Sequence, residues 1–105
     1  MSNKYAKSER ENIEKYQAKG YKNNYNVVYG SLVDVATKEA YKPEEVFVVK
    51  EYRYEGMSNP SDMSILYIIE TKDYGKGTIL IGYGPSGDLS ASEFFKAIPK
   101  SNYRN

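Results

Sequence analysis

Three β-rich runs separated by two short turn segments dominate the second half of the sequence. The first run, 46–55, leads to the segment 59–62 (NPSD), where Asn and Pro occupy the positions that a type I turn favours. The second run, 64–71, is followed by 73–77 (DYGKG), which is typical of a hairpin loop. Because runs joined by such short connections return antiparallel to one another, the sequence predicts a three-stranded meander whose third strand covers 78–83.

Two capping boxes predict a helix on either side of the remaining strands. The segment 8–11 (SERE) has the Ser-x-x-Glu spacing that satisfies free amides at a helix start, and Gly20 supplies a stop, so we expect a helix over 9–19. The segment 90–93 (SASE) repeats the signal before a run of apolar residues that Pro99 ends.

The chain between the first helix and the meander predicts two further strands. Tyr25, Val27 and Tyr29 alternate with polar residues, and a weaker apolar run follows over 32–35. The polar segment 37–45 contains a proline and is expected to be a connection. We therefore predict an α+β fold with two layers, in which an antiparallel sheet of about four to five strands carries both helices on one face.

The length of the chain fits one domain over 1–105, with 1–7 and 100–105 expected to be frayed. Val, Ile, Leu and Phe make up 21 of the 105 residues, so the 12 tyrosines must supply much of the buried apolar area. The chain has no cysteine, which leaves packing alone to hold the fold.

Composition also bears on location and partners. The net charge is +1, which disfavours a nucleic-acid partner because such proteins concentrate positive charge on one face. The N-terminus lacks the apolar core of a signal peptide, and the longest run of aliphatic residues and tyrosine, Ile65–Ile69, is too short to cross a bilayer. We expect a cytoplasmic protein without a membrane partner, and the sequence does not determine its oligomeric state.

The segment 82–87 (GYGPSG) has the G-x-G-x-x-G outline of a nucleotide-binding loop. The second capping box places the helix start beyond the last glycine, so the amides of the loop would not be gathered at a helix N-terminus. Too few residues follow for the second parallel strand and the acidic ribose ligand. We therefore read a strand-to-helix loop and expect no cofactor.

A cluster of charges surrounds the first turn of the meander. Glu51, Arg53 and Glu55 are expected on one face of their strand, and Asp62 lies across the turn. Three interpretations are open: a surface charge ladder that neutralises itself, a recognition patch, or an acid–base pair of Glu55 and Asp62. The chain has no histidine, which removes the usual proton shuttle and the commonest metal ligand.

Tyrosines and lysines on the sheet raise the alternative of a single-stranded nucleic-acid binder that stacks bases on aromatic rings. Tyr52 and Tyr54 are expected on the face opposite Glu51, beneath a helix. Glu51 in the same strand would repel phosphate. The pattern also differs from the aromatic motifs of ribonucleoprotein sheets, so this alternative ranks below a protein or small-molecule partner.

The segment 51–62 (EYRYEGMSNPSD), followed by 65–69 (ILYII) and 76–80 (KGTIL), resembles the signature of a family of short bacterial proteins without established function. The likeness extends upstream through 20–27 and 42–46, and covers roughly residues 12–84. Members sometimes carry the label phosphoribosylpyrophosphate synthetase. This chain lacks the acidic phosphoribose loop and the length of that enzyme, so the resemblance implies a fold and leaves function open.

These observations predict a non-enzymatic binding or regulatory module that engages a protein or small ligand through the hairpin 51–62 and the loop 84–89. The alternative is a small hydrolase or transferase that uses Glu55 and Asp62, and a further one is an oligomerising structural domain. No catalytic or metal-binding residue is assigned. The candidate binding residues are Glu51, Arg53, Glu55, Met57, Asn59, Asp62 and Tyr83.

Overall fold

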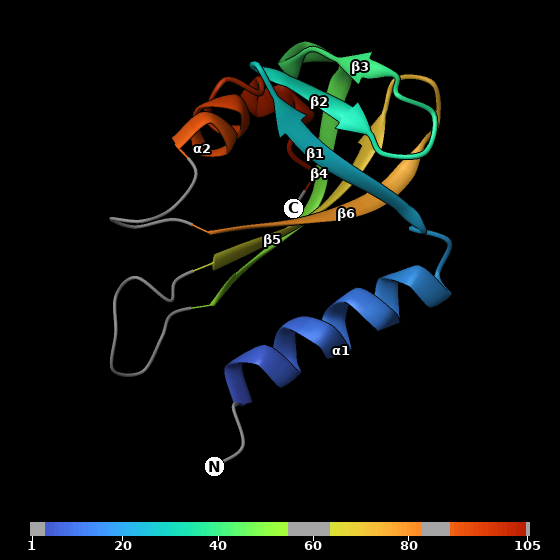
Figure 1. Ribbon diagram of the computed structural model, residues 1–105, viewed down its shortest axis with the longest axis vertical. Helices are drawn as coiled ribbons and strands as arrows, with labels where there is room; N and C mark the ends of the chain where they lie inside the picture. Colours follow the sequence, from blue (N-terminus) through green and yellow to red (C-terminus); the bar gives the residue numbers. More distant parts are fainter. Residues whose placement is uncertain (1–3, 55–63, 83–88, 105) are drawn as a thin grey trace.

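The computed structural model describes residues 4–54, 64–82 and 89–104, and the side chains of 10–54, 64–82 and 90–104 (Figure 1). It is an α+β fold with one long helix, one short helix and six strands among these residues. The elements in chain order are α1 (Lys4–Ala18), β1 (Asn23–Val28), β2 (Ser31–Asp34), β3 (Ala40–Tyr41), the 3-10 turn η1 (Pro43–Glu45), β4 (Val46–Tyr54), β5 (Ser64–Thr71), β6 (Lys76–Gly82), α2 (Leu89–Lys96) and the 3-10 turn η3 (Lys100–Asn102).

The strands form a single sheet in the order β3-β2-β1-β6-β5-β4. The antiparallel meander β4-β5-β6 is present as predicted, and β1 and β2 form an antiparallel pair. The expectation of a wholly antiparallel sheet of four to five strands is wrong in two respects. A sixth strand, β3, pairs with β2 within the segment read as a connection, and β1 pairs with β6 in parallel.

The parallel pairing of β1 and β6 depends on a glycine. A Cβ atom at Gly77 would lie 2.2 Å from the backbone oxygen of Asn23 and 2.6 Å from the ring of Tyr25. Only a residue without a side chain allows the two strands to approach so closely. The pairing covers just two residues of each strand, Asn23 and Asn24 against Gly77 and Thr78.

A β-bulge between Val48 and Lys50 changes which residues of β4 share a face. One extra residue in a strand reverses the alternation beyond it. Val46 and Val48 therefore share a face with Glu51 and Arg53, whereas the sequence predicted that they share one with Tyr52 and Tyr54. The strand pattern alone gives no signal for the extra residue.

Helix α2 packs on the face of the sheet that holds the main apolar core. Phe95 stacks on Tyr67 of β5, with ring centres 3.9 Å apart and planes 2° from parallel. Phe94 and Ile98 are also buried, and the core continues through strands at both ends of the sheet. It comprises Tyr25, Leu32, Tyr41, Val46, Val48, Ile65, Tyr67, Ile69, Ile79, Ile81, Ala91, Phe94, Phe95 and Ile98.

Helix α1 lies on the opposite face, so the prediction of both helices on one face is wrong (Figure 1). Tyr52 pairs with Leu66, and the neighbouring Glu51 pairs with Tyr67, which places Tyr52 and Tyr67 on opposite sides of the sheet. Tyr16 of α1 hydrogen bonds to Tyr52, whereas Phe95 of α2 stacks on Tyr67. The sheet therefore lies between the two helices instead of beneath both.

Two chain segments expected to be frayed are ordered in part. Helix α1 begins at Lys4, so Ser8 lies within the helix and not at its first position. Ala6 and the neighbouring lysines have high helix propensity, which favours the earlier start. Residues 100–104 form η3 and then bridge to Val48 of β4. At the other end of α1, Gly20 ends the helix with a positive φ of 104°, as predicted.

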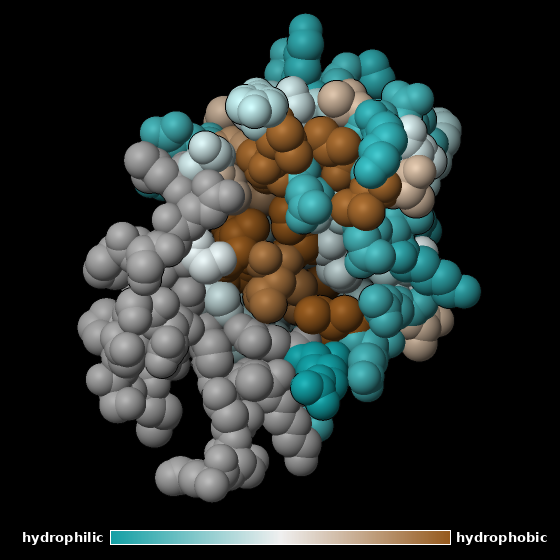
Figure 2. Space-filling view, viewed as in Figure 1, coloured by the Kyte–Doolittle hydropathy of each residue, from teal (hydrophilic) through white to brown (hydrophobic). Residues whose placement is uncertain are grey.

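Figure 2 shows apolar side chains gathered near the centre of the surface, over β1, β2 and β6. Val28 of β1 and Leu80 of β6 are both more than two fifths exposed. Because β1 and β6 pair only at Asn23 and Asn24, apolar residues further along these strands reach the surface. None of the described helices is long and apolar enough to cross a membrane.

Candidate functional site at the outer strand

Two of the seven predicted binding residues fall within the described chain, Glu51 and Arg53. Both lie in the second half of β4, on the face that carries α2. The other five, Glu55, Met57, Asn59, Asp62 and Tyr83, lie outside the described residues, as does most of the 82–87 loop. The acid–base pair of Glu55 and Asp62 therefore stays a prediction.

Glu51 and Arg53 form an ion pair along the strand. Arg53 Nε lies 3.1 Å from Glu51 Oε2, and the arginine side chain is 61% exposed against 20% for the glutamate. An exposed pair of this kind contributes little to stability, because water screens it and two long side chains must be ordered. The geometry favours the interpretation as a charge ladder over that as an active site.

The outer edge of β4 is partly covered by the C-terminal segment. Tyr103 bridges to Val48 in parallel, and the Arg104 amide donates a 2.8 Å hydrogen bond to the Val48 carbonyl. Asn102 Nδ2 donates to the Val46 carbonyl at 3.0 Å. Within the described chain β4 is the last strand of the sheet, and this bridge is the only isolated one to it. Residues 50–54 continue along the same edge beyond the bridge.

A second surface feature lies on the α1 face, where four lysines surround three tyrosine rings. Each ammonium lies 5.2 to 5.9 Å from a ring centre, a separation at which a cation is attracted to the ring. None of the ion pairs between described residues includes these lysines. We call this set the lysine–tyrosine surface: Lys15, Lys19, Lys50, Lys76, Tyr16, Tyr21 and Tyr52.

The hydroxyl groups of these tyrosines hold α1 on the sheet. The Tyr16 and Tyr52 oxygens lie 2.8 Å apart, and Tyr21 donates a 3.1 Å hydrogen bond to Glu70. Partial burial and the hydrogen bond with Tyr16 raise the pKa of Tyr52 to about 12. Asn12 of the helix donates a further bond to the Tyr54 hydroxyl at 2.5 Å. The raised pKa keeps the Tyr52 hydroxyl protonated at physiological pH, so its bond with Tyr16 persists there.

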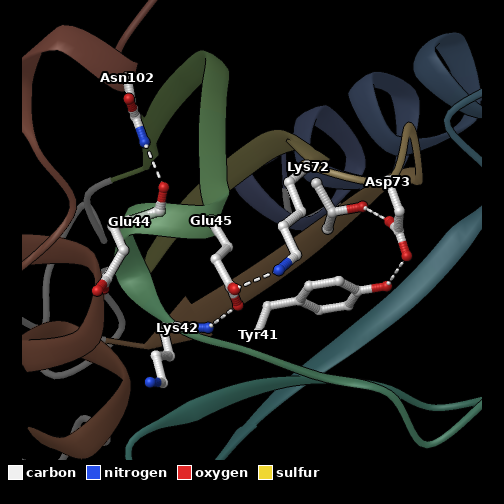
Figure 3. Close-up of polar contacts among 8 residues, drawn as sticks. Tyr41, Lys42, Glu44, Glu45, Lys72, Asp73 and Asn102 are labelled. Carbon is white, nitrogen blue, oxygen red and sulfur yellow. Dashed lines mark hydrogen bonds and ion pairs between the residues drawn. The ribbon is translucent and has the colours of Figure 1, made fainter.

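A third polar group ties the β5–β6 turn to β3 and η1 (Figure 3). Asp73 accepts hydrogen bonds from the Tyr41 hydroxyl at 2.8 Å and the Thr71 hydroxyl at 2.5 Å. These bonds lower the pKa of Asp73, that from Thr71 most strongly, while burial and the bond to Asp73 raise the pKa of Tyr41 to about 12. Asp73 thus stays ionised and Tyr41 protonated at neutral pH.

The neighbouring carboxylate in Figure 3 is equally well satisfied. Glu45 accepts from Lys72 Nζ at 2.6 Å and from the Lys42 amide at 2.9 Å. Both oxygens of Asp73 and of Glu45 are in use. In each carboxylate one oxygen makes a local contact and the other joins distant segments of the chain, which is a structural role. Among the described residues no group of histidine, cysteine or acidic side chains is arranged to hold a metal ion.

Comparison with known proteins gives no relative. No protein-family model matches the chain, and no curated protein or solved structure is significantly similar to it. The resemblance to a family of short bacterial proteins therefore stays a prediction.

Sequence reasoning found Glu51 and Arg53 but missed the lysine–tyrosine surface. It placed Tyr52 and Tyr54 beneath a helix, which the contacts with Tyr16 and Asn12 confirm. The lysines come from α1 and the turn after it, from β4 and from β6, which are distant in the sequence. A signal was available in the basic excess of the first 22 residues, yet only the packing of α1 brings those lysines to the sheet.

Proposed function

We propose that the protein is a non-enzymatic binding module that engages another protein along the outer edge of β4, over residues 50–54. The observation that carries the proposal is the hydrogen bond from the Arg104 amide to the Val48 carbonyl. It shows that this edge accepts backbone pairing, and 50–54 continue the edge in line. Addition of a strand to a sheet edge is a common mode of peptide recognition.

The position of this edge supports a partner-binding role. Residues 50–54 lead directly into the segment 55–63, which the sequence predicts to be the longest turn of the chain. Segments that connect strands frequently carry binding residues, because the sheet holds them in place. The charges of Glu51 and Arg53 on one face and Lys50 on the other would select the partner strand.

The test is an NMR titration with short synthetic peptides that alternate valine with glutamate, with arginine or with both. The amides of Glu51 and Arg53 should move most, because those of Lys50 and Tyr52 point toward β5. Peptides with N-methylated alternate residues, which cannot pair as strands, are the matched control. If no strand-forming peptide moves the β4 amides at millimolar concentration, strand addition is wrong.

The lysine–tyrosine surface favours a second candidate, a single-stranded nucleic acid. Glu51, whose charge argued against this ligand, lies on the opposite face from Lys50 and Tyr52. The surface carries four lysines outside any ion pair of the described chain, and the acidic group beside it, Glu70, is paired with Arg104 at 2.7 Å. Basic side chains interleaved with aromatic rings are typical of proteins that follow a single strand.

Fluorescence anisotropy with labelled oligothymidylate and oligouridylate tests this candidate. Binding should weaken as salt increases and should fall in the double variant Lys50→Gln/Lys76→Gln. The control Lys96→Gln/Lys100→Gln removes the same charge from exposed residues outside the surface. An equal loss of affinity in both double variants would show that binding depends on net charge alone, and would exclude the lysine–tyrosine surface as a defined binding site.

A further inference from the structure

The backbone of β4 determines how a partner strand can meet it. The Val48 carbonyl points away from β5, since it accepts from Arg104. Peptide groups alternate in direction along a strand, and the bulge before Lys50 resets the alternation. Lys50, Tyr52 and Tyr54 therefore direct their backbone groups toward β5, whereas those of Glu51 and Arg53 point outward.

From this edge we infer that the partner of β4 is a second copy of the same chain, paired antiparallel about a two-fold axis at Tyr52. The inference rests on the proposed function, whose site it shares. In this register Glu51 of one copy lies opposite Arg53 of the other, and the outward peptide groups of both residues meet as hydrogen-bonded pairs. A two-fold interface brings identical surfaces together, so each favourable contact occurs twice.

The side chains are self-complementary on the α2 face. Glu51 and Arg53 exchange their contact within one strand for two contacts between copies. Directly opposed residues have Cβ atoms roughly 4.5–5.5 Å apart, within reach of an ion pair. Because the arginine of the existing pair is 61% exposed, the Glu51–Arg53 ion pair within one strand contributes little to the stability of the single chain.

The α1 face is complementary in the same register. Lys50 lies opposite Tyr54 of the second copy, and Tyr52 lies opposite its own counterpart. Within its own strand, the Lys50 ammonium lies 5.9 Å from the centre of the Tyr52 ring. A cation–aromatic pair between Lys50 and Tyr54 of the second copy would be an interaction of the same kind. A slip of one residue would place Glu51 and Arg53 on opposite faces and lose the pairing of charge.

Sedimentation velocity over a series of concentrations, with four proteins, tests the inference. The wild-type chain should associate as its concentration rises. Arg53→Glu and Glu51→Arg should each weaken association roughly tenfold, because like charges then face each other at two places. The double variant Glu51→Arg/Arg53→Glu restores opposite charges and should associate as the wild type does. A mixture of the two single variants should associate more strongly than either alone.

Three outcomes would overturn the inference: a wild-type chain that stays monomeric throughout, single variants that associate like the wild type, or a double variant that fails to recover. Circular dichroism of each variant checks that the exposed substitutions leave the fold intact. The peptide titration distinguishes a failure of the dimer inference from a failure of the proposed function. If peptides shift the amide signals of Glu51 and Arg53 while the chain stays monomeric, strand addition at the β4 edge is supported and the inference that the partner is a second copy is wrong.

Discussion

The two helices are attached to the sheet by different chemistry. Helix α2 presents Phe94 and Phe95 to a buried apolar face, Ile98 follows in the turn after the helix, and these three residues are at least 96% buried. Helix α1 lies on the face that buries Leu66 and Ile68 of β5, and it adds hydroxyl and amide bonds to that apolar contact, with Tyr16 bonded to Tyr52 and Asn12 to Tyr54. Phe94 and Phe95 of α2 thus belong to the main apolar core, whereas α1 covers the other face with hydrogen bonds between side chains and carries the lysine–tyrosine surface.

The largest effect is expected on the α2 side. Phe95→Ala should lower the free energy of unfolding by about 3–5 kcal/mol, because the ring is buried and stacked on Tyr67. Urea denaturation followed by circular dichroism measures the loss. Phe95→Leu, which keeps most of the apolar volume, should lose less. A loss for Phe95→Ala near that of a surface substitution would contradict the assignment of α2 to the core.

On the α1 side the corresponding substitution should cost less. Tyr16 is partly exposed, so Tyr16→Ala should lower the free energy of unfolding by about 2 kcal/mol. Tyr16→Phe, which removes just the hydroxyl bond to Tyr52, should lower it by about 1 kcal/mol. Amide hydrogen exchange should rise in α1 and stay unchanged in α2. Equal acceleration in both helices would show that they unfold as one unit.

Alkaline pH should destabilise the contact between α1 and the sheet, which contains the Tyr52 hydroxyl. The pKa of Tyr52 is raised to about 12, so the folded chain keeps this proton where an unfolded tyrosine, with a pKa of about 10, releases it. The contribution of Tyr52 to the free energy of unfolding is fully present below the pKa of the unfolded state. It is lost as the pH rises through the pKa of the folded state. Denaturation at stepped pH should show this decline, and Tyr52→Phe should flatten it. The same slope in both proteins would contradict a protected hydroxyl.

The smallest effect is expected at the turn held by Asp73. Its pKa is lowered by the hydroxyls of Thr71 and Tyr41, so its contribution to stability is present above its ordinary pKa of about 4 and is lost as the pH falls through the lower folded value. Asp73→Asn should therefore be slightly less stable than wild type at neutral pH and show a weaker dependence on acid. Thermal unfolding between neutral pH and strong acid compares the two, and parallel curves would contradict the role of the carboxylate.

Local signals in the sequence predicted the elements that depend on near neighbours. Turn residues at 59–62 and 73–77 predicted the meander. The second capping box predicted where α2 lies, although the helix begins at Leu89 and so includes Ser90. The face on which each side chain of β4 lies was harder to predict. The bulge after Val48 is not marked by any characteristic residue, and it reverses the faces of Glu51 and Tyr52 relative to Val46 and Val48. The parallel pairing at Gly77 and the side on which α1 packs are set by contacts between distant segments, which a pattern of neighbours does not contain.

The candidate site, too, was predicted where it depends on near neighbours and missed where it depends on distant contacts. Glu51 and Arg53 were found from their spacing in one strand, and the ion pair between them confirms that they lie on one face. The outward direction of their peptide groups follows from the bulge and from the bond between Arg104 and Val48, so no pattern in the sequence could have shown it.

We expect α2 to belong to the core and the outer edge of β4 to bind a second copy of the chain. A dilution series of amide NMR spectra of the wild-type chain tests both expectations most directly. The amide signals of Glu51 and Arg53 should move most with concentration, while those of residues 91–98 stay in place. Spectra that do not change with concentration, or changes centred on 91–98, would contradict binding at the β4 edge.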